Sequence, residues 1–188
     1  MLSFNYQITT SDGVSTRFEL EMSELLADIK IPVDDPPEWA WLKNNQCTIC
    51  KLHESQTEYC PAAINLIPLV NAYADVNSFE KVRLEVTTPE RGYWQDTTLA
   101  SALRSMMGLL VAGSACPSFV MLKPMARFHL PGSTELETIV RMTSFHLLSR
   151  FLSDHDMTRE ELLAELRTLV GDINTINASL AKRLRVVA

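Results

Sequence analysis

The residues best suited to chemistry in this sequence are its four cysteines. Cys47 and Cys50 form a C-x₂-C pair, whereas Cys60 and Cys116 each stand directly before a proline. A tetrahedral metal site takes four soft ligands, and a C-x₂-C turn presents two thiolates to one ion while the other ligands come from elsewhere in the fold. Four cysteines with none left over therefore predict one metal centre that joins residues 47 to 116.

The ligand set leaves two metals open, because four thiolates suit both zinc and a [4Fe–4S] cluster. The Cys-Pro pairs favour a ferredoxin-type cluster, and Lys51 stands where a zinc knuckle has glycine. Structural zinc is the commoner role for such a site, so zinc is the first prediction and the cluster is the alternative. Thioredoxin-like chemistry would leave Cys60 and Cys116 without a role. Four unrelated buried thiols are the remaining interpretation, since free cysteine is often buried.

A second unusual stretch, KPMARFHLP, spans residues 123–131 shortly after Cys116. In an extended segment, Arg127 and His129 would point to the same side. We predict that these two residues contact the cofactor, by donating to cluster sulfurs or by binding an anion. A purely structural connection is the alternative interpretation of this stretch.

The other three histidines are expected to lie in solvent. His53 lies between Cys50 and Cys60 and would replace a thiolate only if one of the cysteines were not a ligand. His146 and His155 lie on or just after a predicted helix. No nucleophile elbow, phosphate-binding glycine loop or dinucleotide fingerprint is present, so the sequence favours a protein that is not an enzyme.

The elements that must position the cysteines begin with a β-hairpin. Apolar residues alternate with polar ones on both sides of a Ser11-Asp12-Gly13 turn signal. The alternating residues are Phe4, Tyr6 and Ile8, then Phe18, Leu20 and Met22. Residues 81–88 alternate in the same way, and we expect this strand to join the hairpin in a small antiparallel sheet. Three prolines, Pro32, Pro36 and Pro37, exclude regular structure between these strands.

Helical spacing of apolar residues dominates the rest of the chain. The pattern predicts helices at residues 61–73, 99–111, 117–122, 139–152 and 162–184. Cys60 would cap the first helix, Pro124 would end the third, and capping boxes at Thr134 and Thr158 would open the last two. Gly171 is expected to kink or split the last helix. The predicted class is α+β, with a small antiparallel sheet followed by a predominantly helical body.

Length and composition favour a single domain over residues 1–188. Its parts are an acidic hairpin and Pro-rich segment (1–46), a cysteine-bearing region (47–116) and a helical C-terminal part (117–188). A net charge of -6 argues against a nucleic-acid partner, which requires clustered basic residues. The apolar run Leu99–Val111 is shorter than the ~20 residues that span a bilayer. We therefore expect no membrane association and a cytoplasmic protein, in which thiols stay reduced.

Several motifs together resemble an uncharacterised bacterial domain family. They are the C-x₂-C pair, YCPAAINL at residues 59–66, ACP at 115–117 and KPMARFHLP at 123–131. The resemblance covers nearly the whole chain and implies a bacterial, single-domain, soluble protein, but no chemistry. The residues themselves leave two hypotheses. One is a structural zinc site in a module that docks a protein partner or forms a homo-oligomer, and the other is an iron–sulfur redox or sensor protein tuned by Arg127 and His129.

Overall fold

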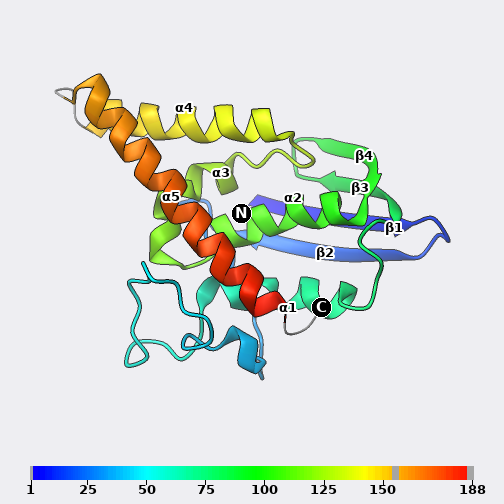
Figure 1. Cartoon of the computed structure of the whole chain (residues 1–188). Coiled ribbons are helices and arrows are strands. Elements are labelled where there is room, and N and C mark those ends of the chain that lie inside the picture. Colours follow the sequence, from blue (N-terminus) through cyan, green and yellow to red (C-terminus); the bar gives the residue numbers. More distant parts are fainter. Residues whose placement is uncertain (1, 154–156, 186–188) are drawn as a thin grey trace.

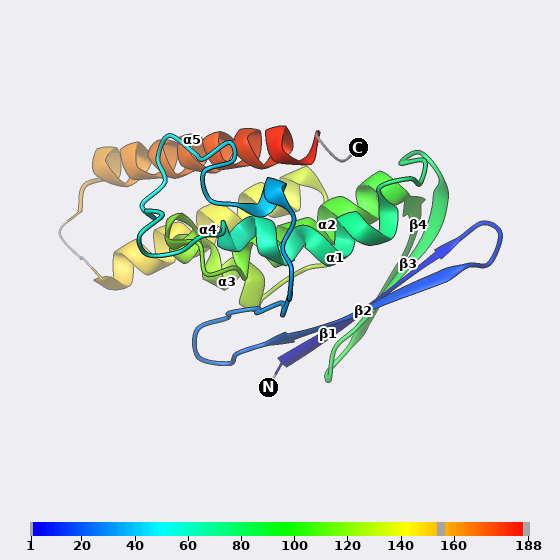
Figure 2. The ribbon, with the colours of Figure 1, turned by 90° about the horizontal axis from the view of Figure 1, so that it is seen from below.

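The sheet and the helices occupy separate layers, so the predicted α+β class is confirmed. The computed structural model describes residues 2–153 and 157–185. Its strands form one antiparallel sheet in the order β2-β1-β3-β4, and the helices lie on one face of that sheet (Figures 1 and 2). The strands are β1 (Leu2–Thr10), β2 (Ser15–Met22), β3 (Lys81–Thr87) and β4 (Gly92–Thr98). The helices are η1 (Glu38–Ala40), α1 (Pro61–Tyr73), α2 (Leu99–Ala112), η2 (Pro117–Leu122), α3 (Lys123–Arg127), α4 (Glu135–Ser153) and α5 (Arg159–Leu184).

The N-terminal hairpin forms as its alternation predicts. β1 and β2 pair with Tyr6 opposite Phe18, and the turn between them closes through the Gly13 N–H, which donates to the Thr10 carbonyl at 3.0 Å. Gly13 has a φ of +88°, a conformation that glycine adopts without a steric penalty. β3 pairs with the other side of β1, with Val86 opposite Tyr6, as expected for a small antiparallel sheet.

β4 is the strand that the sequence pattern missed. The pattern predicts only helix after residue 95, whereas β4 continues to Thr98 and α2 begins at the next residue. β4 is an edge strand, and its Trp94, Gln95 and Asp96 side chains are exposed. No apolar alternation marks such a strand, because it has little buried surface of its own. Its pairing with β3 specifies it instead, with Tyr93 opposite Val86.

The core lies between the inner face of the sheet and the first helix layer. Alternate residues of β1 and β3 point into it, and α2 packs over the sheet with most of its apolar residues buried. Asn65 on α1 is the buried polar residue at this contact. Its side-chain amide donates to the carbonyls of Ile29 and Leu110 at 3.0 Å each, which joins α1, α2 and the segment after β2.

The later helices match their predicted positions, with two corrections. Pro124 does not end a helix but lies in the first turn of α3, where its missing N–H costs no hydrogen bond. α5 runs unbroken through Gly171, because a single glycine weakens a helix without having to interrupt it. The Thr158–Glu161 capping box forms at the start of α5, and Thr134 and Glu137 exchange the same hydrogen bonds at the start of α4.

α5 forms an outer layer on the side of the helices away from the sheet (Figure 2). It crosses the molecule diagonally, and its C-terminal half lies beside the irregular segment that precedes α1 (Figure 1). Among the described residues, no single helix combines the length and apolar composition of a membrane span. Within the same part of the chain, α2 taken together with residues 117–127, across a 115° bend, meets both criteria.

Candidate metal centre

Cys47 and Cys50 lie on a loop whose two ends are held together. We call residues 43–59 the cysteine loop. At its base, the Leu42 N–H donates to the Glu58 carbonyl at 2.8 Å, and the Cys60 N–H donates to the Ala40 carbonyl at 2.9 Å. The C-x₂-C turn itself is closed by the Cys50 N–H, which donates to the Cys47 carbonyl at 3.0 Å. Both thiols are half-buried, and the loop contains no helix or strand between residues 43 and 58.

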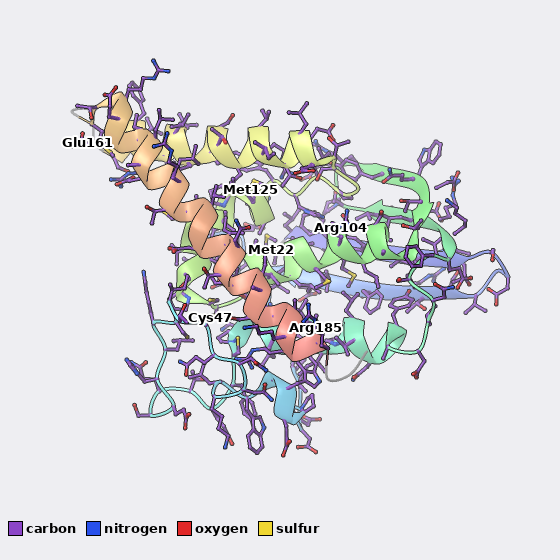
Figure 3. All side chains as sticks on the ribbon, viewed as in Figure 1. Met22, Cys47, Arg104, Met125, Glu161 and Arg185 are labelled. Carbon is purple, nitrogen blue, oxygen red and sulfur yellow. The ribbon has the colours of Figure 1, made fainter. Side chains whose placement is uncertain are left out.

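Arg183 of α5 fixes the segment that leads into the cysteine loop. Its guanidinium is buried and donates to the carbonyls of Trp39, Trp41 and Leu42, at 2.5 to 3.0 Å. A single buried side chain thereby supplies donors to three backbone carbonyls, of which that of Trp41 also accepts from the Asn44 N–H at 3.1 Å. Figure 3 shows Cys47 beside the C-terminal half of α5. Ser179, one helical turn before Arg183, forms a hydrogen bond with the Cys47 side chain.

Cys60 and Cys116 occupy equivalent positions at the starts of two helices. Cys60 precedes Pro61 at the N-cap of α1, and Cys116 precedes Pro117 at the N-cap of η2. Neither thiol caps its own helix. The sequence predicts both placements, because proline suits the first turn of a helix. The two sulfurs are therefore directed by helix starts that lie 56 residues apart in the sequence.

Lys123 holds the turn that carries Cys116. Its ammonium group forms an ion pair with Asp28 at 2.5 Å and donates to the carbonyls of Gly113 and Ser114 at 3.2 and 2.8 Å. These carbonyls follow the end of α2, where a cation interacts favourably with the helix dipole. The buried Ser114 hydroxyl also accepts from the Cys116 N–H at 3.4 Å. The backbone around Cys116 is thus held from both sides.

The four thiols lie close enough together to interact electrostatically. Burial raises the pKa of the Cys116 thiol to about 11, and negative charge on Cys60, Cys47 or Cys50 adds to this effect. Burial also raises the pKa of Cys47, as do the charges of Cys60 and Cys50. The hydrogen bond from Ser179 and the positive charge of Arg183 act in the opposite direction on Cys47. The structure thus brings all four predicted ligands into one region.

The thiols are near one another without enclosing a common point. All four cysteines are free, with no disulfide between them. Across residues 2–153 and 157–185, no three histidine, cysteine, aspartate or glutamate side chains are arranged as ligands of one metal ion. His53 is exposed on the cysteine loop, as expected for a solvated residue.

The structure places His129 against the sheet. Its Nε2 shares a hydrogen bond with the Tyr6 hydroxyl, and its ring meets the Phe4 ring edge-on at 5.6 Å. Burial lowers the pKa of His129 to about 3, and the positive charge of Arg141 adds to the shift. Arg127 ends α3 and lies over the Phe128 ring. The segment is therefore not extended, whereas the expectation that Arg127 and His129 point to the same side assumed an extended segment. A cofactor-contacting role for Arg127 and His129 stays a prediction.

His146 is not at the surface, as the sequence analysis expected, but is buried on α4. Its Nε2 lies 3.9 Å from a Glu165 carboxylate oxygen on α5, and Arg150 binds the same carboxylate at 2.7 Å. Whether a histidine on an amphipathic helix is buried depends on the neighbouring helix. The residue pattern of one helix alone does not show this. His155 lies outside the described residues.

Ser179 and Arg183 are the residues near the thiols that the sequence analysis missed. A signal for Arg183 was present, since this charged residue interrupts an apolar stripe between Leu180 and Leu184. A charge on the buried face of a helix calls for a polar partner across the contact. Nothing comparable marks Ser179, because small hydroxyl residues are common on helix surfaces.

The fold is that of an α+β protein, and its four cysteines lie in one region formed by the cysteine loop and the starts of α1 and η2. The chain belongs to the family described as Domain of unknown function (DUF6901), which it matches over residues 2–188. The family match confirms the expectation of an uncharacterised domain family that spans nearly the whole chain. Searches of the curated proteins and of the solved structures found no match.

Proposed function

We propose that this protein binds a zinc ion through Cys47, Cys50, Cys60 and Cys116. The ion would be structural and would stabilise a module that interacts with other protein chains. One observation carries the proposal: thiols from three separate segments of the chain interact electrostatically in one partly buried region. Unrelated buried cysteines have no physical reason to converge from the cysteine loop and from two helix starts.

The chemistry of this region suits a dication. Without a metal, burial and the charges of the neighbouring thiols raise the pKa of Cys47 and of Cys116, which opposes their ionisation. A bound Zn²⁺ replaces the thiol protons and offsets the repulsion among the resulting thiolates. Affinity for the metal should therefore rise with pH, and binding should release protons. The positive charge of Arg183 and the hydroxyl of Ser179 would further stabilise a thiolate at Cys47.

Metal binding requires the sulfurs to draw together, and the cysteine loop is the segment that can move. Cys60 and Cys116 are held by helix starts, whereas Cys47 and Cys50 lie on backbone without regular hydrogen bonding. Moving the Cys47–Cys50 turn therefore disrupts no helix or strand. Arg183 fixes the segment before the loop, so the movement would stay local to residues 43–59.

A [4Fe–4S] cluster on the same four ligands is the second candidate. The observation that favours it is the pair of Cys-Pro sequences, both of which present their sulfur from a helix start. A cluster would give the protein a redox or sensing role, with Arg127 and His129 proposed to tune it. The cytoplasm is the compartment that either version of the proposal implies, since both need reduced thiols.

Elemental analysis of protein purified without oxygen tests the proposal. We expect about one zinc per chain in a colourless protein, whereas iron, sulfide and a brown colour would favour the cluster. Cys116→Ser should lose most of the metal. His53→Ala is the matched control, since it removes a potential ligand from the same loop and should leave the metal content unchanged. Wild-type protein that binds neither metal nor cluster when both are supplied would end the proposal.

A further inference from the structure

The C-terminal half of α5 is attached to the base of the cysteine loop by a buried charge, that of Arg183, which is 1% exposed. Its guanidinium donates to the carbonyls of Trp39, Trp41 and Leu42 at 2.5 to 3.0 Å. These acceptors are neutral, so they satisfy N–H groups of the guanidinium without balancing its charge. The Nε–H of the same side chain is buried and has no acceptor among the described residues. An arginine side chain stays charged in proteins, so this end of α5 carries a buried positive charge.

The thiols and this half of α5 pack on the same core. Ile176 of α5 belongs to the buried apolar core that includes Cys60, and the other three cysteines pack against that core. The Cys47 side chain forms a hydrogen bond with Ser179, and the charge of Arg183 is close enough to favour a negative charge on Cys47. Figure 3 shows Cys47 beside the same half of the helix. The buried positive charge therefore lies next to the thiol cluster.

We infer that a metal ion bound by the thiols holds the C-terminal half of α5 in place, with Arg183 as the link between them. The inference rests on the metal site proposed above. A Zn²⁺ ion with four thiolate ligands carries a net negative charge, and a buried guanidinium nearby would balance it. The Nε–H of Arg183 can in addition donate to a thiolate sulfur, since hydrogen bonds to ionised acceptors are the stronger ones.

Metal binding and the docking of this helix half are therefore coupled. Without the metal, a buried charge with neutral acceptors makes docking less favourable, because an unbalanced buried charge costs free energy. By thermodynamic linkage, the factor by which zinc stabilises docking equals the factor by which docking raises zinc affinity. The N-terminal half of α5 is held separately, by the ion pair of Glu165 with Arg150 of α4, and should stay docked.

The coupling would convert metal occupancy into a change of the protein surface. Undocking of the C-terminal half would uncover the apolar side chains that face the body. These are Ile173, Ile176, Leu180 and Leu184, all buried or half-buried in the structure. Loss of the metal would thus expose an apolar strip on α5 while the sheet and the first helix layer stay folded.

Hydrogen exchange of the full chain, loaded with zinc or treated with a strong chelator, tests the inference. After chelation, the amides of residues 173–184 should exchange about tenfold or more faster, a factor within the usual range of coupling between two sites. The amides of residues 159–168 should exchange at an unchanged rate, because the contact with α4 remains. A loss of global stability alone would act on the sheet as well and would not distinguish the two halves of one helix.

Arg183→Gln should remove the link, since glutamine carries no charge. Residues 173–184 of the zinc-loaded variant should exchange as fast as in the chelated wild type, with no further acceleration on chelation. Its zinc affinity, measured by competition with a chromophoric chelator, should fall by the same factor, about tenfold or more. Arg183→Lys keeps the charge and should retain most of the zinc dependence. It serves if Arg183→Gln does not fold, and a folded Arg183→Lys protein without zinc dependence would then contradict the inference.

Arg185→Gln is the matched control, because it removes the same charge from an exposed side chain at the end of α5 (Figure 3). It should behave like the wild type in both measurements. A wild type that binds zinc while residues 173–184 exchange at the same rate with and without it overturns this inference and leaves the zinc site in place. An Arg183→Gln protein with native circular dichroism and wild-type zinc affinity also overturns it. A wild type that binds no zinc overturns the proposed function, and this inference with it.

Discussion

The thiol cluster and the Tyr6–His129 pair are two regions where distant parts of the chain bring polar side chains into a partly buried setting. The hydrogen bonds around Tyr6 and His129 form a connected chain. The Gly132 N–H donates to Ser105, Ser105 forms a hydrogen bond with Tyr6, and Tyr6 shares one with His129. Burial raises the pKa of Tyr6 and lowers that of His129, so both groups are neutral when they meet. The thiols differ, because their mutual influence is repulsive as soon as they ionise.

This difference separates a structural cluster from a candidate binding site. Buried polar groups that satisfy one another stabilise a fold and require nothing further. Groups that share a region without pairing need an additional partner before they can ionise, and a metal ion is the partner that thiols prefer. The Tyr6–His129 pair therefore joins residues 128–132 to the sheet, whereas the thiol cluster is the place where we expect a ligand.

Removal of the metal should have the largest effect of the changes that test this comparison. Structural zinc binds peptides with an apparent free energy of ~10 kcal/mol or more. We therefore expect a strong chelator to lower the free energy of unfolding by several kcal/mol, measured by urea titration with and without the chelator. His129→Gln should lower stability in both conditions but keep the difference between them. Equal free energies of unfolding for chelated and untreated wild type would mean that the thiols, like the Tyr6–His129 pair, stabilise the fold without a bound ligand.

Acid should act on the Tyr6–His129 region with an intermediate effect. The pKa of His129 is lowered from 6.5 to about 3, so between these values the unfolded chain binds a proton that the folded chain does not. Stability should therefore fall as the pH falls from about 6.5 to about 3, by up to about 1.4 kcal/mol per pH unit. The measurement compares Cys116→Ser with Cys116→Ser/His129→Gln, so that metal release does not contribute. Parallel stability curves for the two proteins would contradict the buried neutral state of His129.

The smallest effect is expected at Ser179, which tests whether a side chain of α5 contributes to the metal affinity of the thiol cluster. Its hydroxyl lowers the pKa of Cys47, so Ser179→Ala should weaken zinc binding by about tenfold, as the loss of an outer hydrogen bond to a ligand typically does. Competition with a chromophoric chelator measures this change. Thr175→Ala is the control on the same helix, because the Thr175 hydroxyl donates to the Gly171 carbonyl within α5. Equal affinities in all three proteins would exclude Ser179 from the site.

The sequence predicted the elements with internal periodicity and missed the elements that depend on their neighbours. The hairpin, α1 and α2 follow from alternation or helical spacing within each segment. β4 could not be predicted in this way, because its side chains are mostly exposed and β3 specifies it. The burial of His146 escaped prediction for a similar reason, since α5 covers it and the pattern of α4 alone does not show this.

The same division applies to the candidate site. The residue type, the C-x₂-C spacing and the two Cys-Pro sequences identified the four cysteines, and the prolines placed Cys60 and Cys116 at helix starts. The contribution of α5 through Ser179 and Arg183 was not visible, because these residues lie more than 60 positions beyond Cys116. The contact of His129 with the face of the sheet, where its ring nitrogen shares a hydrogen bond with Tyr6, was not visible in the sequence either.

By itself, the sequence determined the fold class, the strand and helix positions that carry their own periodicity, and the identity of the four thiols. These features depend on local backbone preferences and on side-chain chemistry, which neighbouring residues specify. Only the tertiary structure decided that the four thiols share one region, that His129 packs against Phe4 and Tyr6 of the sheet, and that His146 is buried. Contacts between distant segments decide such features, because burial and charge interactions act through space and not along the chain.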